Sequence, residues 1–517
     1  MTAADESTFV ILLTIGVYLL IMVAVGLAFS NKTGNVGEFY LGGRKLGPIV
    51  TAMSAEASDM SSWLLMGLPG VAYLTGCAEA GWTAIGLAVG TYLNWLCVAK
   101  RLRIYSYSCG AITIPDFFSK RYHDEKKVLM CCTAVIILIF FVPYTASGFS
   151  ACGKLFHSLF DWDYHTAMII SAVIIILYTC MGGFLAASTT DLIQSVIMTI
   201  ALISIVGFGI STAGGVGNVI DNAKEIAGYL ELTNIHNVET GGADSYTPLT
   251  IASTLAWGLG YFGMPHILLR FMAIEDKDKV KTSRRIASVW VVISMAIAIF
   301  IGIIGNSLTK KGTIGSLDGS SSETVVIKIA QFMSEQSVLL AVVAGLVFAG
   351  ILACTMSTSD SQLLAASSAM SENLLKGVFN LKITEKLSML VARGVLVVIA
   401  LLGVILAWDQ DSSVFRVVSF AWAGFGATFG PVMIAALFWK RSNVYGAIAG
   451  LISGGVMVFV WKFGIAKLGG IFSIYELLPA FLTASFFIIV VSLLTKKPDE
   501  EDYKEFDNVK ALSREYK

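Results

Sequence analysis

Long apolar runs recur along the whole chain and restrict the folds that it can adopt. Each run approaches the roughly 20 residues that an α-helix needs to cross a bilayer, whereas a membrane β-strand needs only about ten residues of alternating polarity. The runs lie at roughly 8–29, 48–74, 78–99, 128–150, 164–183, 189–211, 250–272, 286–307, 338–368, 388–408, 413–438, 444–463 and 477–495. The sequence therefore predicts an all-α multi-span membrane protein with about thirteen spans.

The composition supports this class and argues against several others. Of the 517 residues, 14% are charged, where a soluble domain carries about a quarter. The formal net charge is zero, so nothing indicates nucleic acid as a partner, and the lipid bilayer is the expected one. The first run follows an acidic leader that lacks the features of a cleaved signal peptide, so we expect it to remain as a span. No nucleophile or phosphate-loop motif is recognisable, and we expect neither an enzyme nor a cofactor.

The basic residues predict an orientation. If the N-terminus is outside, most of the 36 Lys and Arg residues fall in segments that are then cytoplasmic. The two longest loops, roughly 212–249 and 308–337, are then external. We expect a short surface helix near 220–230 in the first loop and an amphipathic stretch at 323–333 in the second. The charged tail 498–517 is expected to be cytoplasmic, and either mobile or bound to the surface.

A polar stretch, Ser54–Trp63, interrupts one of the apolar runs. It places two carboxylates, Glu56 and Asp59, and four serines inside a segment that is otherwise long enough to span. Such residues are costly within a membrane and usually mark an ion or substrate path. We predict a discontinuous helix whose freed carbonyls can hold a cation and whose freed N–H groups can hold an anion. The alternative is a polar seam that only packs against a neighbouring helix.

A second interruption, Trp257–His266, follows five spans later and contains three glycines and a proline. An offset of five spans, which is an odd number, gives the two breaks opposite directions, which is typical of inverted repeats with a central site. Trp257 and Tyr261 are four residues apart and share a helix face, which suits a small apolar substrate with a charged end. Ordinary core packing around a kinked helix is the alternative.

A third polar cluster, Cys354–Gln362, places Ser357, Thr358 and Ser361 on one helix face. Hydroxyl and carbonyl oxygens suit Na⁺, although such hydroxyls can also bond back to their own helix. Asp191 begins another span from the inside. It is either a second ion-linked carboxylate, or a helix cap or ion-pair partner near the cytoplasmic face.

Several of these segments resemble the sodium/solute symporter family, and in part its proline branch, from about Gly37 to Leu494. The resemblance implies a leucine-transporter-like core at 47–440, with inverted five-helix repeats at about 47–215 and 250–440. Residues 1–46 would supply the external N-terminus, one added span and a cytoplasmic loop. Residues 441–497 would add two peripheral spans, before the tail 498–517. The segments that carry the resemblance are Leu41–Arg44, Ser58–Ser61 with Trp63–Gly70, Gly182–Asp191, Trp257–His266, Met356–Thr358 and Ser419–Pro431.

The resemblance also implies three sets of site residues. The family's main sodium site would use the carbonyls of Ala57, Met60 and Cys354 and the hydroxyls of Ser357 and Thr358. A proline pocket would be formed by Ser61, Ser62, Trp63, Tyr144, Trp257, Tyr261 and Pro265. The third set combines the resemblance with the residues themselves: candidates for coupling or for a second ion are Asp59, Asp191, Ser361, Asp360, Glu56 and Arg44.

Three positions depart from the family pattern. Ser62 replaces a glycine of the proline symporters, and Glu56 replaces a residue that is usually small. Asp360 replaces one of two serines that form a second sodium site in some members, while Ser361 matches the other. The number of coupled ions therefore stays open.

The expected function is uptake of L-proline with Na⁺ by alternating access, performed by a monomer in a bacterial-type cytoplasmic membrane. One alternative is another small amino acid or a monocarboxylate, coupled to Na⁺ or to H⁺ with help from Glu56. An alternative from another class is a channel or a transporter-like sensor.

Overall fold

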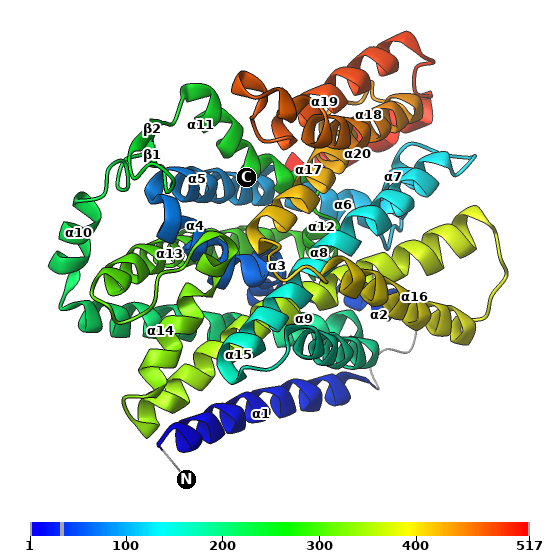
Figure 1. The fold of residues 1–517 in the computed structure, drawn as a ribbon. Helices are drawn as coiled ribbons and strands as arrows, with labels where there is room; N and C mark the ends of the chain where they lie inside the picture. Colours follow the sequence, from blue (N-terminus) through cyan, green and yellow to red (C-terminus); the bar gives the residue numbers. More distant parts are fainter. Residues whose placement is uncertain (1–2, 31–35, 515–517) are drawn as a thin grey trace.

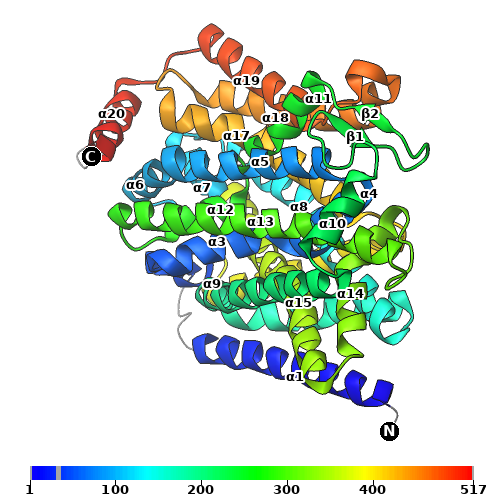
Figure 2. The same cartoon turned by 90° about the vertical axis from the view of Figure 1, so that its left-hand side faces the viewer.

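The computed structural model describes residues 3–30 and 36–514. Nearly all of their regular secondary structure is helical. The long helices run side by side in one bundle, and the two ends of the described chain lie at opposite ends of it (Figure 2). Two short strands, β1 (Asn234–His236) and β2 (Ala243–Ser245), form an antiparallel hairpin in which Asn234 lies opposite Ser245. The structure is therefore the all-α bundle that the apolar runs predict.

Ten segments of the described chain are long and apolar enough to cross a membrane by length and composition. The remaining three predicted spans correspond to two interrupted helices and to the shorter apolar helix Tyr164–Leu177, so that the count of thirteen crossings stays a prediction. The ten segments are Glu6–Phe29, Cys77–Ser108, Val128–Phe160, Gly183–Ala213, Lys277–Lys310, Val338–Val378, Lys386–Leu406, Val414–Phe438, Val444–Leu468 and Leu477–Leu494.

The first interrupted helix consists of α3 (Pro48–Ser62), a π-helical turn η2 (Trp63–Gly67) and α4 (Leu68–Thr75). Its break lies at Ser61, whose φ of 48° and ψ of −171° leave the helical region. A sparsely populated backbone conformation of this kind costs about 1–3 kcal/mol. Beyond the break, the N–H of Trp63 turns back onto the carbonyls of Met60 and Ser61. The discontinuous helix predicted from the polar stretch is confirmed.

The second interrupted helix consists of α11 (Pro248–Leu255), a 3₁₀ turn η4 (Ala256–Phe262) and α12 (Pro265–Ala273). Met264 is extended, with φ −75° and ψ 109°, and Pro265 opens α12 at a position where its missing N–H is not needed. The predicted second break is therefore confirmed. The predicted spans 164–183 and 189–211 form one continuous element, α9 (Tyr164–Ala213), which changes direction at Gly183 with a φ of 62°.

From each interrupted helix one segment, α3 and α12 respectively, lies in the middle of the bundle, whereas α11 lies at its rim (Figure 1). On one side of them, α15 (Val338–Ser368) packs against α3, α9, α1 (Ala3–Ser30) and α8 (Val128–Phe160). On the other side, α17 (Val414–Phe438) packs against η4, α18 (Val444–Phe463) and α19 (Leu477–Leu494). The remaining long helices, α13 (Val280–Lys310) and α16 (Glu385–Leu406), pack on α4 and α8 respectively.

Helix α5 (Cys77–Leu93) crosses η4 at a seam of glycines. A Cβ atom on Gly90 would lie 2.3 Å from the carbonyl oxygen of Gly258, so only glycine fits there. The two backbones therefore touch, and the polar side chains on either side of the seam come within reach of one another. Helix α5 continues through η3 (Asn94–Ala99) into α6 (Lys100–Ser108).

Short elements cover the two ends of the bundle. The hairpin end carries α10 (Val216–Lys224), η6 (Gly319–Thr324) and α14 (Val325–Ser334), so the two helices expected in the long loops are present. The turns η8 (Ile465–Leu468) and η9 (Gly470–Phe472) lie between α18 and α19. The other short elements are α2 (Val36–Leu41), η1 (Gly42–Arg44), α7 (Ile114–Arg121), η5 (Lys277–Lys279) and η7 (Ala369–Val378).

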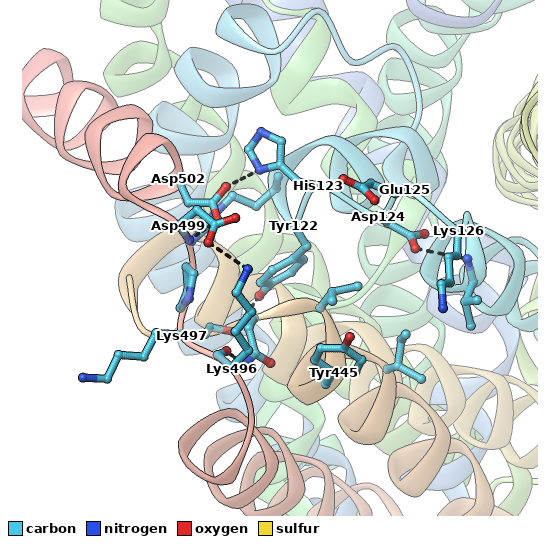
Figure 3. A pocket seen from close by; sticks show the side chains of 17 residues that line it. Tyr122, His123, Asp124, Glu125, Lys126, Tyr445, Lys496, Lys497, Asp499 and Asp502 are labelled. Carbon is cyan, nitrogen blue, oxygen red and sulfur yellow. Dashed lines mark hydrogen bonds and ion pairs between the residues drawn. The ribbon is translucent and has the colours of Figure 1, made fainter.

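The tail differs from one of the two expected states: it is not left unstructured but forms a helix, α20 (Glu500–Arg514), which packs against α6. Phe506 and Val509 are buried in this contact, and the Phe506 ring lies 5.3 Å from the guanidinium of Arg121. At the start of the helix, Asp502 pairs with His123 and Asp499 with Lys496 (Figure 3). The surface-bound alternative is therefore correct for the described part of the tail.

Candidate functional site

A cluster of oxygen atoms lies where α3 meets α15. The hydroxyl of Ser357 donates to the carbonyl of Ala57 at 2.8 Å and lies 3.2 Å from that of Cys354. The hydroxyl of Thr358 is 3.1 Å from the same Cys354 carbonyl. Four of the five predicted sodium ligands are thus in direct contact, and the fifth, Met60, has its carbonyl at the break. Uncharged oxygens of this kind suit a hard cation.

Asp59 connects the two interrupted helices. Its carboxylate Oδ2 accepts a hydrogen bond of 2.5 Å from the hydroxyl of Tyr261 in η4. Its carbonyl accepts one of 3.1 Å from the hydroxyl of Tyr144 in α8. Two of the predicted pocket residues therefore bind Asp59, which is one of the candidates for coupling or for a second ion.

Aromatic rings cover the break. The ring centroids of Trp63 and Trp257 are 5.7 Å apart, and Phe415 at the start of α17 lies 5.8 Å from Trp63. Trp422 donates its indole N–H to the carbonyl of Trp257 at 2.7 Å. Sequence reasoning assigned no role to Phe415 or Trp422, although Trp422 falls in the segment 419–431 that carries the resemblance.

These groups enclose a small cavity of about 10 Å³. A single water molecule needs about 10–15 Å³, so an amino acid enters only if the surrounding helices move apart. Of the seven predicted pocket residues, three line this cavity, namely Trp63, Tyr144 and Trp257; the other four, Ser61, Ser62, Tyr261 and Pro265, do not. The residues that line it are Asp59, Met60, Trp63, Leu87, Tyr144, Trp257, Val418 and Trp422.

A buried ion pair closes the hairpin end of the site. Glu323 in η6 accepts hydrogen bonds from Lys154 Nζ at 2.9 Å and from the N–H groups of Val414 and Phe415 at 3.0 Å each. It also accepts one of 2.7 Å from the Ser413 hydroxyl. A carboxylate at a helix N-terminus is stabilised by the unsatisfied N–H groups there. Glu323 therefore fixes the start of α17, which holds Phe415 over the aromatic rings. Sequence reasoning missed this pair.

A second buried ion pair involves Asp191. The Arg270 guanidinium in α12 is 3.1 Å from the Asp191 carboxylate, and the two side chains are 1% and 0% exposed. The same guanidinium donates to the hydroxyls of Ser54 at 3.0 Å and Ser361 at 2.5 Å. Pairing was one of the two roles left open for Asp191, but its partner was not anticipated. Asp360 accepts a 2.5 Å hydrogen bond from Thr179 in α9.

The last two candidates are Glu56 in α3 and Arg44 in η1. Glu56 accepts a hydrogen bond of 3.1 Å from the indole N–H of Trp95. Arg44 lies at the opposite end of the bundle from the hairpin and donates to the carbonyls of Met272 at 2.7 Å and Ala111 at 2.5 Å. Burial, reinforced by the nearby charge of Arg103, lowers the pKa of Arg44 to about 10, so that its guanidinium stays protonated at neutral pH. Arg44 therefore clamps η1 to α12 and to the segment after α6.

The described residues include no group of three or more His, Cys, Asp or Glu side chains that could hold a metal ion. The sites above instead combine neutral oxygens with isolated carboxylates. The sequence profile of the sodium:solute symporter family matches residues 39–454. The chain belongs to the sodium:solute symporter family. Its members are symporters and not enzymes, in line with the expectation that the chain is not an enzyme.

Relatives within this family align over nearly the whole chain. The sodium/proline symporter of Haemophilus influenzae is 41% identical over 512 residues, which cover 98% of this chain and 99% of the relative. The osmoregulated proline transporter OpuE of Bacillus subtilis is 37% identical, with coverage of 98% and 99%. The sodium/proline symporter of Staphylococcus aureus is 39% identical, with coverage of 97% and 96%.

Solved structures share the fold. A Na⁺-coupled sialic acid symporter in its substrate-bound outward-open state superposes with a TM-score of 0.78 at 17% identity, covering 95% of this chain and 99% of that one. A nucleobase-cation-symport-1 family transporter in a closed conformation gives 0.55 at 14% identity, covering 91% and 98%. These likenesses confirm the predicted leucine-transporter-like fold of a multi-span symporter.

Proposed function

We propose that this symporter imports L-proline together with Na⁺. The observation that carries the proposal is that two sites share one broken helix: Ala57 belongs to the oxygen cluster before the break, and Trp63 to the aromatic cavity after it. The substrate follows from the relatives, which are named proline transporters and are 37–41% identical over nearly the full length.

In this proposal Na⁺ occupies the cluster formed by α3 and α15. The ion replaces the hydrogen bonds of the Ser357 and Thr358 hydroxyls, so that both hydroxyls and the carbonyls of Ala57, Met60 and Cys354 turn their lone pairs to it. Cation binding therefore pulls the broken helix toward α15 and fixes the geometry at Ser61. Proline then presents its carboxylate to the N–H groups freed at the break and its ring to Trp63, Trp257 and Tyr144.

Transport requires the cavity to open at one end at a time. The Glu323–Lys154 pair keeps the hairpin end closed, and Arg44 holds η1 against α12 and the chain after α6 at the other end. Ligands change the populations of the two open forms only through their different affinities for them. Each positive charge that moves inward contributes about 2.3 kcal/mol per 100 mV of membrane potential.

The arrangement in the membrane and along the chain belongs to the same proposal. We place the hairpin end and the N-terminus outside a bacterial-type cytoplasmic membrane and α20 in the cytoplasm, because most Lys and Arg then lie inside. Residues 47–440 form the transport core with repeats at about 47–215 and 250–440, 1–46 and 441–497 flank it, and 498–517 form the tail. A single chain contains every residue of the site, so the monomer is the transporting unit.

The test is counterflow of labelled proline in proteoliposomes that contain the purified protein. We expect labelled proline to accumulate against unlabelled proline with Na⁺ on both sides, and not when choline replaces Na⁺. A panel of small amino acids and monocarboxylates should compete poorly. Equal counterflow without Na⁺, or uptake that follows only a pH gradient, would refute the sodium coupling. Currents far larger than the proline flux would instead indicate a channel.

A further inference from the structure

Glu56 takes no part in the mechanism above, yet it is almost completely buried. It precedes Asp59 by three residues on α3, so the two carboxylates share a helix face. Their exposed fractions are 1% and 6%. Each carboxylate receives one hydrogen bond, from Trp95 and from Tyr261 respectively, on one of its oxygens. Among the described residues, nothing hydrogen-bonds the other two oxygens, Glu56 Oε2 and Asp59 Oδ1.

Two further oxygens face the same region from the neighbouring helix. Thr91 in α5 and Asn94 in η3 are three residues apart and each is 1% exposed. Asn94 donates its amide to the carbonyl of Tyr261 at 2.9 Å, and Thr91 lies beside the Tyr261 hydroxyl. Within the described chain, Thr91 Oγ1 and Asn94 Oδ1 have no hydrogen-bond partner. The glycine seam between α5 and η4 brings the segment with Thr91 and Asn94 close to the break in the second interrupted helix.

The region therefore has an excess of acceptors. Three donors are used: the Trp95 indole on Glu56, the Tyr261 hydroxyl on Asp59, and one amide hydrogen of Asn94 on a carbonyl. The Thr91 hydroxyl and the second amide hydrogen of Asn94 are neutral donors and cannot balance two carboxylate charges. The two fully buried ion pairs of the described chain, Lys154–Glu323 and Arg270–Asp191, do not include these carboxylates. Buried carboxylates without a counter-charge are costly. A hard cation satisfies both the charge and the oxygens at once.

We propose that Glu56, Asp59, Thr91 and Asn94 form a second Na⁺ site, between α3 and α5 and separate from the cluster on α15. The proposal rests on the proposed function, because it adds an ion to the same transport cycle. The α15 cluster uses only uncharged oxygens, so one ion there balances the charge of Asp59. The carboxylate of Glu56 then calls for another cation, which gives two Na⁺ per proline.

Two measurements on the full-length protein test this site. The first is equilibrium binding of radioactive sodium to the detergent-solubilised protein, and the second is the charge moved per proline in proteoliposomes. We expect two Na⁺ bound and two charges moved for the unaltered protein, and one of each for Glu56→Gln, which still transports proline. Glu372→Gln, which removes a carboxylate that contacts Ser388 and Lys376 near the end of α15, should keep both values at two.

A second variant covers the case in which Glu56→Gln does not fold. Thr91→Val keeps the shape of the side chain and removes one oxygen, so it should weaken the second sodium binding event about tenfold and leave the first unchanged. One Na⁺ bound by the unaltered protein would overturn the inference. A third outcome is one Na⁺ bound, two charges moved and acidification of the vesicle lumen. It would assign a proton to the site between α3 and α5 and would also overturn the inference. Two Na⁺ bound without proline transport would refute the proposed function while leaving the site standing.

Discussion

The Arg270–Asp191 pair gives the sharpest prediction about stability. At 3.1 Å and an effective dielectric constant of about 20, the two charges attract by about 5 kcal/mol. Asp191→Asn removes this attraction and leaves a guanidinium that is 1% exposed with its hydrogen bonds to Ser54 and Ser361. Breaking one partner of a buried pair usually costs about 3–5 kcal/mol, and we expect a loss in this range.

The double variant Asp191→Leu with Arg270→Met should recover most of this loss, because no buried charge is left without a partner. The measurement is equilibrium unfolding in mixed micelles of dodecyl maltoside and sodium dodecyl sulfate, followed by tryptophan fluorescence. An Asp191→Asn protein within about 0.5 kcal/mol of the unaltered one would refute the reasoning, because values that small are typical of surface substitutions. A double variant less stable than the single one would refute it as well.

The same measurement decides between the two roles that the sequence left open for Asp191. Bound Na⁺ stabilises the folded state by about 2.7 kcal/mol at a hundred times its dissociation constant. If Asp191 only pairs with Arg270, Asp191→Asn should keep the whole sodium-dependent increment. If Asp191 binds an ion, part of that increment should disappear.

Three other perturbations address the ion, the closure and the tail. Ser357→Ala and Thr358→Ala should each raise the Na⁺ concentration for half-maximal uptake about tenfold, because each removes a ligand oxygen worth about 1 kcal/mol or more. Glu323→Ala should increase at least tenfold the rate at which an impermeant thiol reagent labels a cysteine placed in the cavity, since it releases the start of α17. Phe506→Ala should increase the rate of tryptic cleavage within α20 several-fold, because this ring is buried against α6, whereas Leu512→Ala, at a position 38% exposed, should not.

Matched controls keep these results interpretable. Ser368→Ala removes a hydroxyl that bonds only its own helix, at 2.8 Å from the carbonyl of Ala365, and should not change the Na⁺ dependence. Glu335→Ala removes an exposed carboxylate after α14 and should leave the labelling rate as it was. An unchanged Na⁺ dependence in both hydroxyl variants would exclude the α15 cluster as the coupling site. Unchanged labelling in Glu323→Ala would mean that the ion pair does not hold the cavity closed.

The features that could be predicted from the sequence are those that depend on neighbouring residues. The break after Trp257 follows from three glycines and a proline within ten residues, whose backbone effects are local. The packing of α20 depends on Phe506 and Val509, which recur at helical spacing within a charged segment. This spacing is present in the sequence, but the high charge of the tail also fitted a mobile segment, so the helix was not predicted.

The features that could not be predicted depend on residues far apart in the chain. Lys154 and Glu323 are 169 positions apart, and each alone looks like an ordinary loop charge. Arg270 belongs to a run of basic residues that the orientation rule assigns to the surface, yet it is buried beside Asp191. The individual carbonyl ligands on α3 and α15 were named only through the family resemblance. The hydroxyls of Ser357 and Thr358 were candidates from their spacing, but that spacing also fits bonding within one helix.

The contact between α20 and α6 allows the transport cycle to be followed by fluorescence. Helix α6 continues into η3 and α5, and α5 meets η4 backbone to backbone at Gly90 and Gly258. If η4 moves and displaces the continuous segment α5–η3–α6, then either α20 moves with that segment or Phe506 separates from α6. A fluorophore on Lys510, read against a second dye on α16, would report each turnover from the outside of the bundle without touching the ion or substrate sites.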